Sequence, residues 1–182
     1  MKGFKSFLLE FGEVIITALL IVLPIRMFVI SPYFVKGQSM EPNFHNNDYL
    51  LVDKLSYRFT EPKRGEVIVF KAPDGASYYI KRIIGLPGET IEINNNSIVV
   101  FNKEFPEGLK LNEEYLPADD LTLNNMTIKL RENEYFVLGD NREASFDSRS
   151  WGNLERNKII GKVWVRVAPI SNARAITLPV YK

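Results

Sequence analysis

Residues 78–88 of this 182-residue chain, YYIKRIIGLPG, predict a β-strand followed by a turn. Side chains alternate along a strand, so its two faces are formed by Tyr79, Lys81 and Ile83 and by Ile80, Arg82 and Ile84. One basic residue therefore lies on each face of an otherwise apolar strand. Charged side chains are seldom buried without a reason, so if both faces are covered, one of these cations lies at low dielectric.

The two cations differ in what burial does to them. Burial disfavours the charged form of an amine and lowers its pKa, by several units when burial is complete. A buried Lys81 can therefore be neutral near pH 7 and accept a proton. Arg82 cannot, because the pKa of a guanidinium exceeds ~12, so it is limited to ion pairing. The alternative for Lys81 is an edge-strand lysine that faces water.

Short runs of the same character lie on both sides of this strand. They are rich in β-branched and aromatic residues and bounded by Gly, Pro, Asn or Asp, and they cover residues 49–52, 66–70, 90–93, 97–101, 134–138 and 162–167. No segment after Ser31 sustains a helical period for three turns. Residues 31–182 therefore predict a mainly β domain, a sandwich or a barrel. We expect residues 94–132, with weaker hydrophobic runs and several Asn pairs, to form a small inserted β subdomain.

The N-terminus is apolar. Residues 14–30, VIITALLIVLPIRMFVI, contain one charge, at Arg26, and extension to Val35 reaches the ~20 apolar residues that a spanning helix needs. A cleaved signal peptide would end in a small-x-small site, and the bulky residues 27–30 do not provide one. A buried core helix is the other alternative to a retained anchor.

We predict that residues 1–30 form a cytoplasmic tip and a single-pass anchor in the cell membrane. Lys2 and Lys5 precede the apolar run and favour a cytoplasmic N-terminus. This orientation places residues 31–182, the expected catalytic domain, outside the cytoplasm.

The composition excludes several classes of function. Lys and Arg total 23 against 22 for Asp and Glu, so there is no basic surplus of the kind that nucleic-acid binding needs. The chain has no cysteine, which removes disulfides, thiol nucleophiles and thiolate metal sites. Its one histidine, His45, lies in a polar stretch predicted as a turn, and a multi-histidine metal site cannot be built. We expect no metal and no organic cofactor.

A candidate nucleophile lies in residues 33–42, YFVKGQSMEP. Read as an extended strand that ends at the proline, the segment places Ser39 on the same face as Tyr33 and Val35. Gly37 leaves open space beside the hydroxyl and permits a substrate strand to approach closely. The alternative is a turn serine before a proline. A serine needs a base to take its proton, and without a thiol or a well-placed histidine the remaining candidate is a lysine, as in known Ser-Lys dyads.

Together these residues resemble those of type I signal peptidases, the membrane enzymes that remove signal peptides from exported preproteins. Beyond the apolar N-terminus, the resemblance covers GQSMEP at 37–42, RGEVIVF at 64–70, YIKRIIGLPG at 79–88 and LGDNREASFDSRSWG at 138–152. The last pattern is the most specific, because a pattern of that length seldom arises by chance. The short anchor resembles the form found in Gram-positive and related bacteria. The resemblance implies the mainly β signal peptidase fold, which is shared with self-cleaving SOS-response repressors.

The resemblance also implies a role for each matching residue. Ser39 would be the acylating nucleophile, with its backbone N–H donating to the oxyanion, and Lys81 would be the general base. Ser145 would hydrogen-bond to the lysine amine and orient it. Two ion pairs would support the site, one between Asp140 and Arg82 and the other between Asp147 and Arg149.

Alternation and the resemblance together predict a pocket for small residues, as in Ala-x-Ala cleavage sites. Its expected lining is Tyr33, Val35, Met40, Phe44, Tyr79 and Ile80. The chain departs from the family pattern at three positions. Gly37 lacks the side-chain oxyanion donor that serine gives in some relatives, and one such donor is worth ~2.7–4 kcal/mol. Asn43 stands where threonine is commoner, and Glu89 where aspartate is usual.

The implied partners are the signal peptides of preproteins, the lipid bilayer and, by proximity, the secretion translocon, with no nucleic acid. Three alternatives remain: a specialised peptidase of one secretion or conjugation system, a self-cleaving repressor-type peptidase, and an inactive membrane-tethered β binding module. The apolar N-terminus, in place of a DNA-binding domain, argues against the repressor. The retained serine, lysine and 139–152 segment argue against the inactive module.

Overall fold

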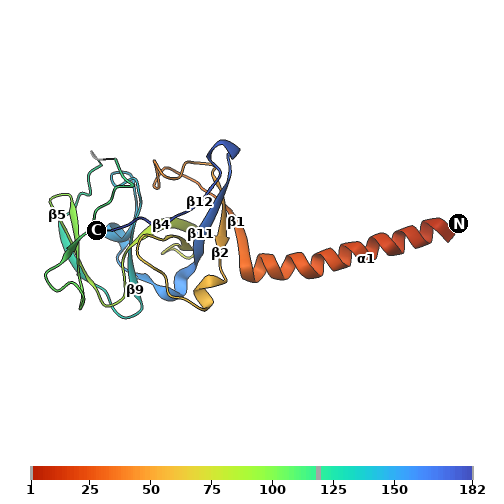
Figure 1. The fold of residues 1–182 in the computed structure, drawn as a ribbon, viewed down its shortest axis with the longest axis horizontal. Helices are drawn as coiled ribbons and strands as arrows, with labels where there is room; N and C mark the ends of the chain where they lie inside the picture. The colour runs from red at the N-terminus through yellow and green to blue at the C-terminus, as the bar shows by residue number, and fades with distance from the viewer. Residues whose placement is uncertain (1, 118–119, 182) are drawn as a thin grey trace.

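The computed structural model describes residues 2–117 and 120–181. A long helix, α1 (Lys2–Pro24), projects away from a β-rich domain (Figure 1). The span Ser6–Val29 is long and apolar enough to cross a membrane, with a mean hydropathy of 2.2, and none of it is buried against the domain. The predicted apolar N-terminal helix and the mainly β class are both confirmed.

The helix continues into the sheet without a linker. Proline lacks an N–H and its ring clashes with the preceding turn, and at its proline α1 gives way to a π-helical turn, η1 (Ile25–Val29), which leads into β1 (Ile30–Phe34). Lys54 holds this junction together. Its N–H donates to the Val29 carbonyl at 2.9 Å, and its Nζ donates to the Met27 carbonyl at 2.6 Å.

The larger sheet is antiparallel, in the order β1-β2-β11-β3-β4-β9-β10, with β12 paired to β11. Its other strands are β2 (Tyr49–Asp53), β3 (Val67–Lys71), β4 (Tyr78–Gly85), β9 (Glu134–Leu138), β10 (Leu154–Glu155), β11 (Ile159–Ala168) and β12 (Arg174–Ala175). Short helices interrupt the connections: η2 (Ser56–Arg58), α2 (Ser148–Trp151), η3 (Arg156–Lys158) and η4 (Ile170–Asn172). β4 is buried from Lys81 to its end, so both faces of this strand are covered.

A smaller antiparallel sheet has the order β7-β6-β5-β8. It consists of β5 (Thr90–Asn94), β6 (Ser97–Phe101), β7 (Leu109–Lys110) and β8 (Met126–Lys129). The β5–β6 hairpin turns at Asn95 and Asn96, whose φ angles of 46° and 62° suit the left-handed backbone of a tight hairpin turn. The sheet starts at Thr90, four residues before the expected boundary of the inserted subdomain at residue 94.

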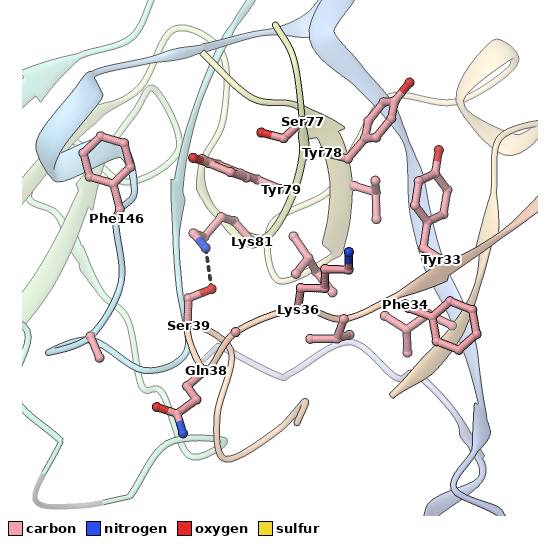
Figure 2. Close-up of a pocket in the computed structure, with 16 residues that line it drawn as sticks. Tyr33, Phe34, Lys36, Gln38, Ser39, Ser77, Tyr78, Tyr79, Lys81 and Phe146 are labelled. Atoms are coloured by element: carbon pink, nitrogen blue, oxygen red, sulfur yellow. Dashed lines mark hydrogen bonds between the residues drawn. The ribbon is translucent and has the colours of Figure 1, made fainter. Parts of the chain in front are cut away.

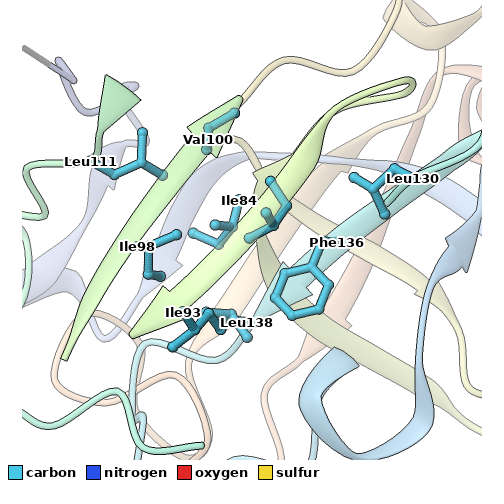
Figure 3. Packing of buried hydrophobic residues seen from close by; sticks show 9 residues of the cluster. Ile84, Ile93, Ile98, Val100, Leu111, Leu130, Phe136 and Leu138 are labelled. Atoms are coloured by element: carbon cyan, nitrogen blue, oxygen red, sulfur yellow. The ribbon is translucent and has the colours of Figure 1, made fainter. Parts of the chain in front are cut away.

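The two sheets share one apolar core (Figure 3). It consists of Ile84, Ile91, Ile93, Ile98, Val100, Leu111, Leu130, Phe136 and Leu138. At Gly85 an added Cβ would lie 2.7 Å from Leu130 and 2.8 Å from Ile91. Glycine therefore lets the side chains of the smaller sheet pack directly against the backbone of β4. This contact fixes the position of β4 on the face that carries Ile84, while Ile83 on its other face packs in a second cluster with Ile68, Phe70 and Val137.

Two strand edges remain unpaired near each other in the described part of the chain. β4 pairs with β3 through residues 78–82, but with β9 only from Arg82 onward. The first half of β4 therefore has one free edge. β1 pairs only with β2 and is the first strand of its sheet. The candidate site lies between these two edges.

Candidate active site

A cleft of about 540 Å³ opens between the segment that follows β1 and the first half of β4 (Figure 2). The loop after β9 contributes to its wall through Ala144 and Phe146. The lining consists of Tyr33, Phe34, Val35, Lys36, Gly37, Gln38, Ser39, Leu50, Val69, Ser77, Tyr78, Tyr79, Ile80, Lys81, Ala144 and Phe146. Most of these side chains are apolar or aromatic, so the cleft suits an extended apolar peptide.

Ser39 lies in a turn, and the prediction of an extended strand up to the proline was wrong. The strand ends at Phe34, and Gly37 has a φ of +90°, which breaks the extended path. The turn at Ser39 is closed by the Glu41 N–H, which donates to the Gln38 carbonyl at 3.1 Å, and a second turn follows, in which the Phe44 N–H donates to the Met40 carbonyl at 2.8 Å. Met40 and Phe44, which follow Ser39 in this turn, are both buried.

Lys81 lies in mid-strand, as expected, and is only 4% exposed. Its Nζ is 2.7 Å from the Ser39 Oγ, although the two residues are 42 positions apart (Figure 2). Burial lowers the pKa of Lys81 from 10.5 to about 8; the charges of Asp147 and Asp140 oppose this shift, and that of Arg149 adds to it. An amine with such a pKa is about one-tenth neutral at pH 7, against roughly 1 in 2,500 for an ordinary lysine.

Arg82, on the opposite face of β4, is equally buried but fully paired. Its Nε and Nη2 donate to the two carboxylate oxygens of Asp140 at 2.8 and 2.6 Å, and its Nη1 donates to the Gly65 carbonyl at 2.9 Å. The Asn43 side chain donates to the same carboxylate at 3.0 Å. Asn43, which stands where threonine is commoner in the family, follows the Ser39 turn, so its amide ties the turn to the ion pair.

Asp147 organises the loop after β9. It accepts from Arg149 Nε at 2.9 Å and Nη2 at 2.8 Å, and from the Gly139 N–H at 3.0 Å. Burial opposes ionisation of this carboxyl, but the hydrogen bonds and charge of Arg149 outweigh it, and the pKa of Asp147 is lowered. At Gly139 an added Cβ would collide with the Ser39 carbonyl and with Ser145. The loop is therefore packed directly against the nucleophile turn.

Arg142 fastens the same loop to the chain before β8. It is fully buried, and its guanidinium donates to both carboxylate oxygens of Glu113, at 2.7 and 2.6 Å. It also donates to the Thr122 hydroxyl at 2.7 Å. The last departure from the family pattern, Glu89, forms an ion pair with Arg64, whose Nη2 lies 2.6 Å from the Glu89 carboxylate.

Comparison with known proteins decides the family, because the family described as "Signal peptidase, peptidase S26" matches residues 8–168. The chain belongs to the signal peptidase family. It is 36% identical over 177 residues to a signal peptidase I P of Bacillus subtilis subsp. natto, a match that covers 95% of this chain and 96% of that one. A probable signal peptidase I-2 of Synechocystis is also 36% identical, with 93% of this chain and 77% of the relative covered.

Among solved structures, a signal peptidase I from Enterococcus faecalis V583 is 29% identical and is matched over 57% of this chain and 97% of its own. The TM-score is 0.48. By its family, this chain is a membrane serine endopeptidase that removes signal peptides. The repressor-type and inactive-module alternatives are thereby excluded.

In this signal peptidase, Ser145 does not make the hydrogen bond expected of it. Its Oγ is buried and makes no hydrogen bond to Lys81, whose Nζ lies against Ser39, but it is near enough to Asp147 to help lower the pKa of that carboxyl. The hydroxyl instead packs against Gly139. Its orienting role stays a prediction.

The predicted pocket residues fall into two groups. Tyr33, Val35, Tyr79 and Ile80 line the cleft. Met40 and Phe44 do not: each is 1% exposed and packs in a core cluster with Leu50, Val52, Val67, Val69 and Val163. The turn at Ser39 points these two side chains inward, beneath the cleft, so their role is to support the nucleophile segment rather than to contact a substrate.

Sequence reasoning missed several lining residues. Leu50 and Val69 reach the cleft from β2 and β3, and Phe146 reaches it from the loop after β9. Leu50 and Val69 lie in apolar strands, so their burial was to be expected, but only the strand pairing shows that they reach the same cleft as Ser39. His45 is exposed, outside the cleft lining, as its polar turn indicated.

Proposed function

We propose that Ser39 is the nucleophile and Lys81 the general base with which this signal peptidase cleaves preproteins. The observation that supports this most directly is the 2.7 Å distance between Lys81 Nζ and Ser39 Oγ, inside a cleft, with the lysine buried. A serine hydroxyl becomes a strong nucleophile only when a neighbouring base takes its proton. An amine whose pKa is about 8 meets that need near neutral pH.

The proposed reaction has two halves. Neutral Lys81 takes the Ser39 proton as Oγ attacks the scissile carbonyl carbon, and the resulting ammonium then protonates the leaving amine. This releases the mature protein and leaves the signal peptide as an ester on Ser39. Lys81, neutral again, removes a proton from water as the water attacks the ester carbonyl; the bond from that carbon to Oγ then breaks, the ammonium returns the proton to Oγ, and the signal peptide leaves with a free carboxyl end.

The oxyanion of each tetrahedral intermediate would be held by the Ser39 backbone N–H. This donor has no partner among the described residues, so it is free to bind a substrate oxygen. Gly37 brings no side-chain donor, but an added Cβ there would meet nothing within 4 Å. The open space beside Gly37 supports close passage of the substrate backbone.

Substrate would bind as an added β-strand between the free edges of β1 and β4. Alternate residues of that strand would face the apolar side of the cleft, formed by Val35, Leu50, Val69 and Ile80. Tyr33 and Tyr79 narrow this side, which favours small residues and fits the expected Ala-x-Ala pattern. The Arg82–Asp140 and Asp147–Arg149 pairs would position the strand and loop that hold the dyad.

For the orientation, we propose a cytoplasmic N-terminus and a catalytic domain outside the cytoplasm, close to the translocon that delivers preproteins. Lys2 and Lys5 before the apolar span support this direction. Protease added to intact spheroplasts would then degrade the catalytic domain. Protection of that domain until the membrane is opened would refute the orientation.

The dyad is tested with the full chain in detergent micelles and a model preprotein. Ser39→Ala and Lys81→Ala should each reduce cleavage to background, while thermal unfolding stays cooperative. Ser77→Ala is the matched control, because this serine lines the same cleft and bonds only to Asp74. It should cleave at the wild-type rate. Cleavage by either dyad variant at a rate near that of the control would refute the assignment.

A further inference from the structure

Lys36 is the exposed cation of the cleft lining, and it has no ion-pair partner among the described residues. The cleft lining contains two lysines, Lys36 and Lys81, and no carboxylate. Lys81 is buried against Ser39, whereas Lys36 is exposed and makes no ion pair or side-chain hydrogen bond among the described residues. Figure 2 shows the Lys36 amine directed into the cleft, between Ser39 and Tyr33. The nearest carboxylate along the chain, Glu41, lines a separate cavity.

The backbone around Lys36 faces the space where a substrate strand would lie. Val35 extends the β1–β2 ladder: its N–H donates to the Asp48 carbonyl and its carbonyl accepts from the Asn47 N–H, both at 2.9 Å. Successive residues of such a ladder turn their backbone groups to opposite sides. The Lys36 N–H and carbonyl accordingly have no partner among the described residues. They are available to a strand added from the cleft side.

The side chains follow the same alternation. Val35 is buried beneath the cleft, and Lys36 is on the opposite, solvent side. In an Ala-x-Ala cleavage site, the two small residues would face the apolar side with Val35. The residue between them would then face the solvent side with Lys36. This step rests on the proposed function, since it takes the substrate as an added strand.

We propose that Lys36 is a specificity-determining residue that favours an acidic side chain at the middle position of the cleavage site and disfavours a basic one. The interaction is an exposed ion pair at the rim of the cleft, so its effect on kcat/KM is modest. Pairs of this kind change rates by at most about fivefold. They are also screened by salt, because the Debye length falls from about 10 Å at 0.1 M to about 3 Å at 1 M.

The test uses the full chain in neutral detergent and three preproteins that differ only at the middle residue, which is Glu, Gln or Lys. The enzymes are wild type, Lys36→Gln and Lys36→Glu. Lys129→Glu is the matched control, with the same charge change on an exposed residue of β8 outside the cleft lining. The measured quantity is the ratio of kcat/KM for the Glu and Lys preproteins within each enzyme, which cancels any effect common to all substrates.

Wild type and Lys129→Glu should prefer the Glu preprotein over the Lys preprotein by about threefold to fivefold, and 1 M salt should remove most of this preference. Lys36→Gln should bring the ratio close to one, and Lys36→Glu should invert it. An unchanged ratio in Lys36→Glu, with all preproteins cleaved, would overturn the role of Lys36 and leave the dyad intact. Failure of wild type to cleave any of the three would overturn both the proposed function and this inference.

Discussion

The two neighbouring cations of β4 lie on opposite faces of the strand and have different partners. Lys81 and Arg82 are each 4% exposed, so both have lost nearly all of their hydration. Arg82 recovers it through two charge-assisted hydrogen bonds to Asp140, through the Gly65 carbonyl and through the Tyr115 ring at 4.1 Å. Among the described residues, Lys81 Nζ hydrogen-bonds only to the neutral Ser39 hydroxyl, and it lies over the Tyr79 ring, 5.7 Å from the ring centre.

The difference shows that a carboxylate in direct contact decides whether a buried cation keeps its proton or has its pKa lowered. A buried cation with a bidentate partner stays charged and holds two segments together. A buried amine whose nearest partner is neutral gives up its proton more readily, and the pKa of Lys81 falls to about 8. One strand thus carries an ion-paired cation on one face and, on the other, the amine that we propose as the base. Exchanging or removing each cation tests this contrast.

The largest effect should come from Lys81→Arg. A guanidinium stays protonated at any working pH, so this variant keeps the charge but has no base. We expect the cleavage rate of a model preprotein to fall by about 10²- to 10⁴-fold, the usual contribution of a general base. The reverse change on the other face, Arg82→Lys, keeps a cation next to Asp140 and should retain much of the activity. Near wild-type cleavage by Lys81→Arg would show that Lys81 acts only through its charge.

For the free energy of unfolding, we expect substitution of Arg82 to have the larger effect and substitution of Lys81 the smaller one. Arg82→Met leaves the Asp140 carboxylate buried without its partner, and we expect it to cost about 3–5 kcal/mol of unfolding free energy. Lys81→Met removes a poorly solvated amine and should leave stability unchanged or slightly higher. Denaturant unfolding in detergent, followed by tryptophan fluorescence, measures both. The double variant Arg82→Met/Asp140→Leu should recover part of the loss. Equal losses in the two single variants would remove the distinction between the faces.

The smallest expected effect is a shift in the pH dependence of cleavage. Protonated Lys81 cannot accept the serine proton, so kcat/KM should be low in acid, rise about tenfold per pH unit, and level off above about pH 8. The Asp147 charge raises the pKa of Lys81, so Asp147→Asn should move the midpoint to lower pH. Cleavage rates across pH 5 to 10, with unfolding checked at each pH, supply the profile. A rate that is flat through the acidic range would exclude a titrating amine.

The sequence predicted features that depend on local periodicity. Alternation along residues 78–84 placed Lys81 and Arg82 on opposite faces, and the apolar run from residue 14 predicted the N-terminal helix. Features that depend on contacts between distant segments were not accessible. The turn at Ser39 depends on Gly37 at positive φ and on the Asn46 side chain, which accepts from the Gly37 N–H at 3.0 Å.

The same limit applies to the pocket and to the departures from the family pattern. Met40 and Phe44 fit an apolar pocket by type, but the turn directs them into the core. The Asn43 side chain donates a hydrogen bond to Asp140, which lies 97 positions away along the chain, and the sequence alone does not reveal this contact. The expected Ser145 hydrogen bond came from resemblance alone, and the side chain packs against Gly139 instead. Such contacts depend on which residues of two strands lie opposite each other, and this register cannot be read from a single sequence.

The short junction between the apolar span and the sheet fixes the distance from the end of that span to the cleft. β1 starts at the residue after η1, Lys54 clamps that joint, and only the five residues of β1 separate it from Val35 at the cleft. At about 3.3 Å per residue, this spacing is about 17 Å. In the proposed orientation, a preprotein held in the bilayer would present its scissile bond to this cleft close to the membrane surface. Cleavage sites displaced farther along an otherwise suitable chain would pass beyond the reach of the serine.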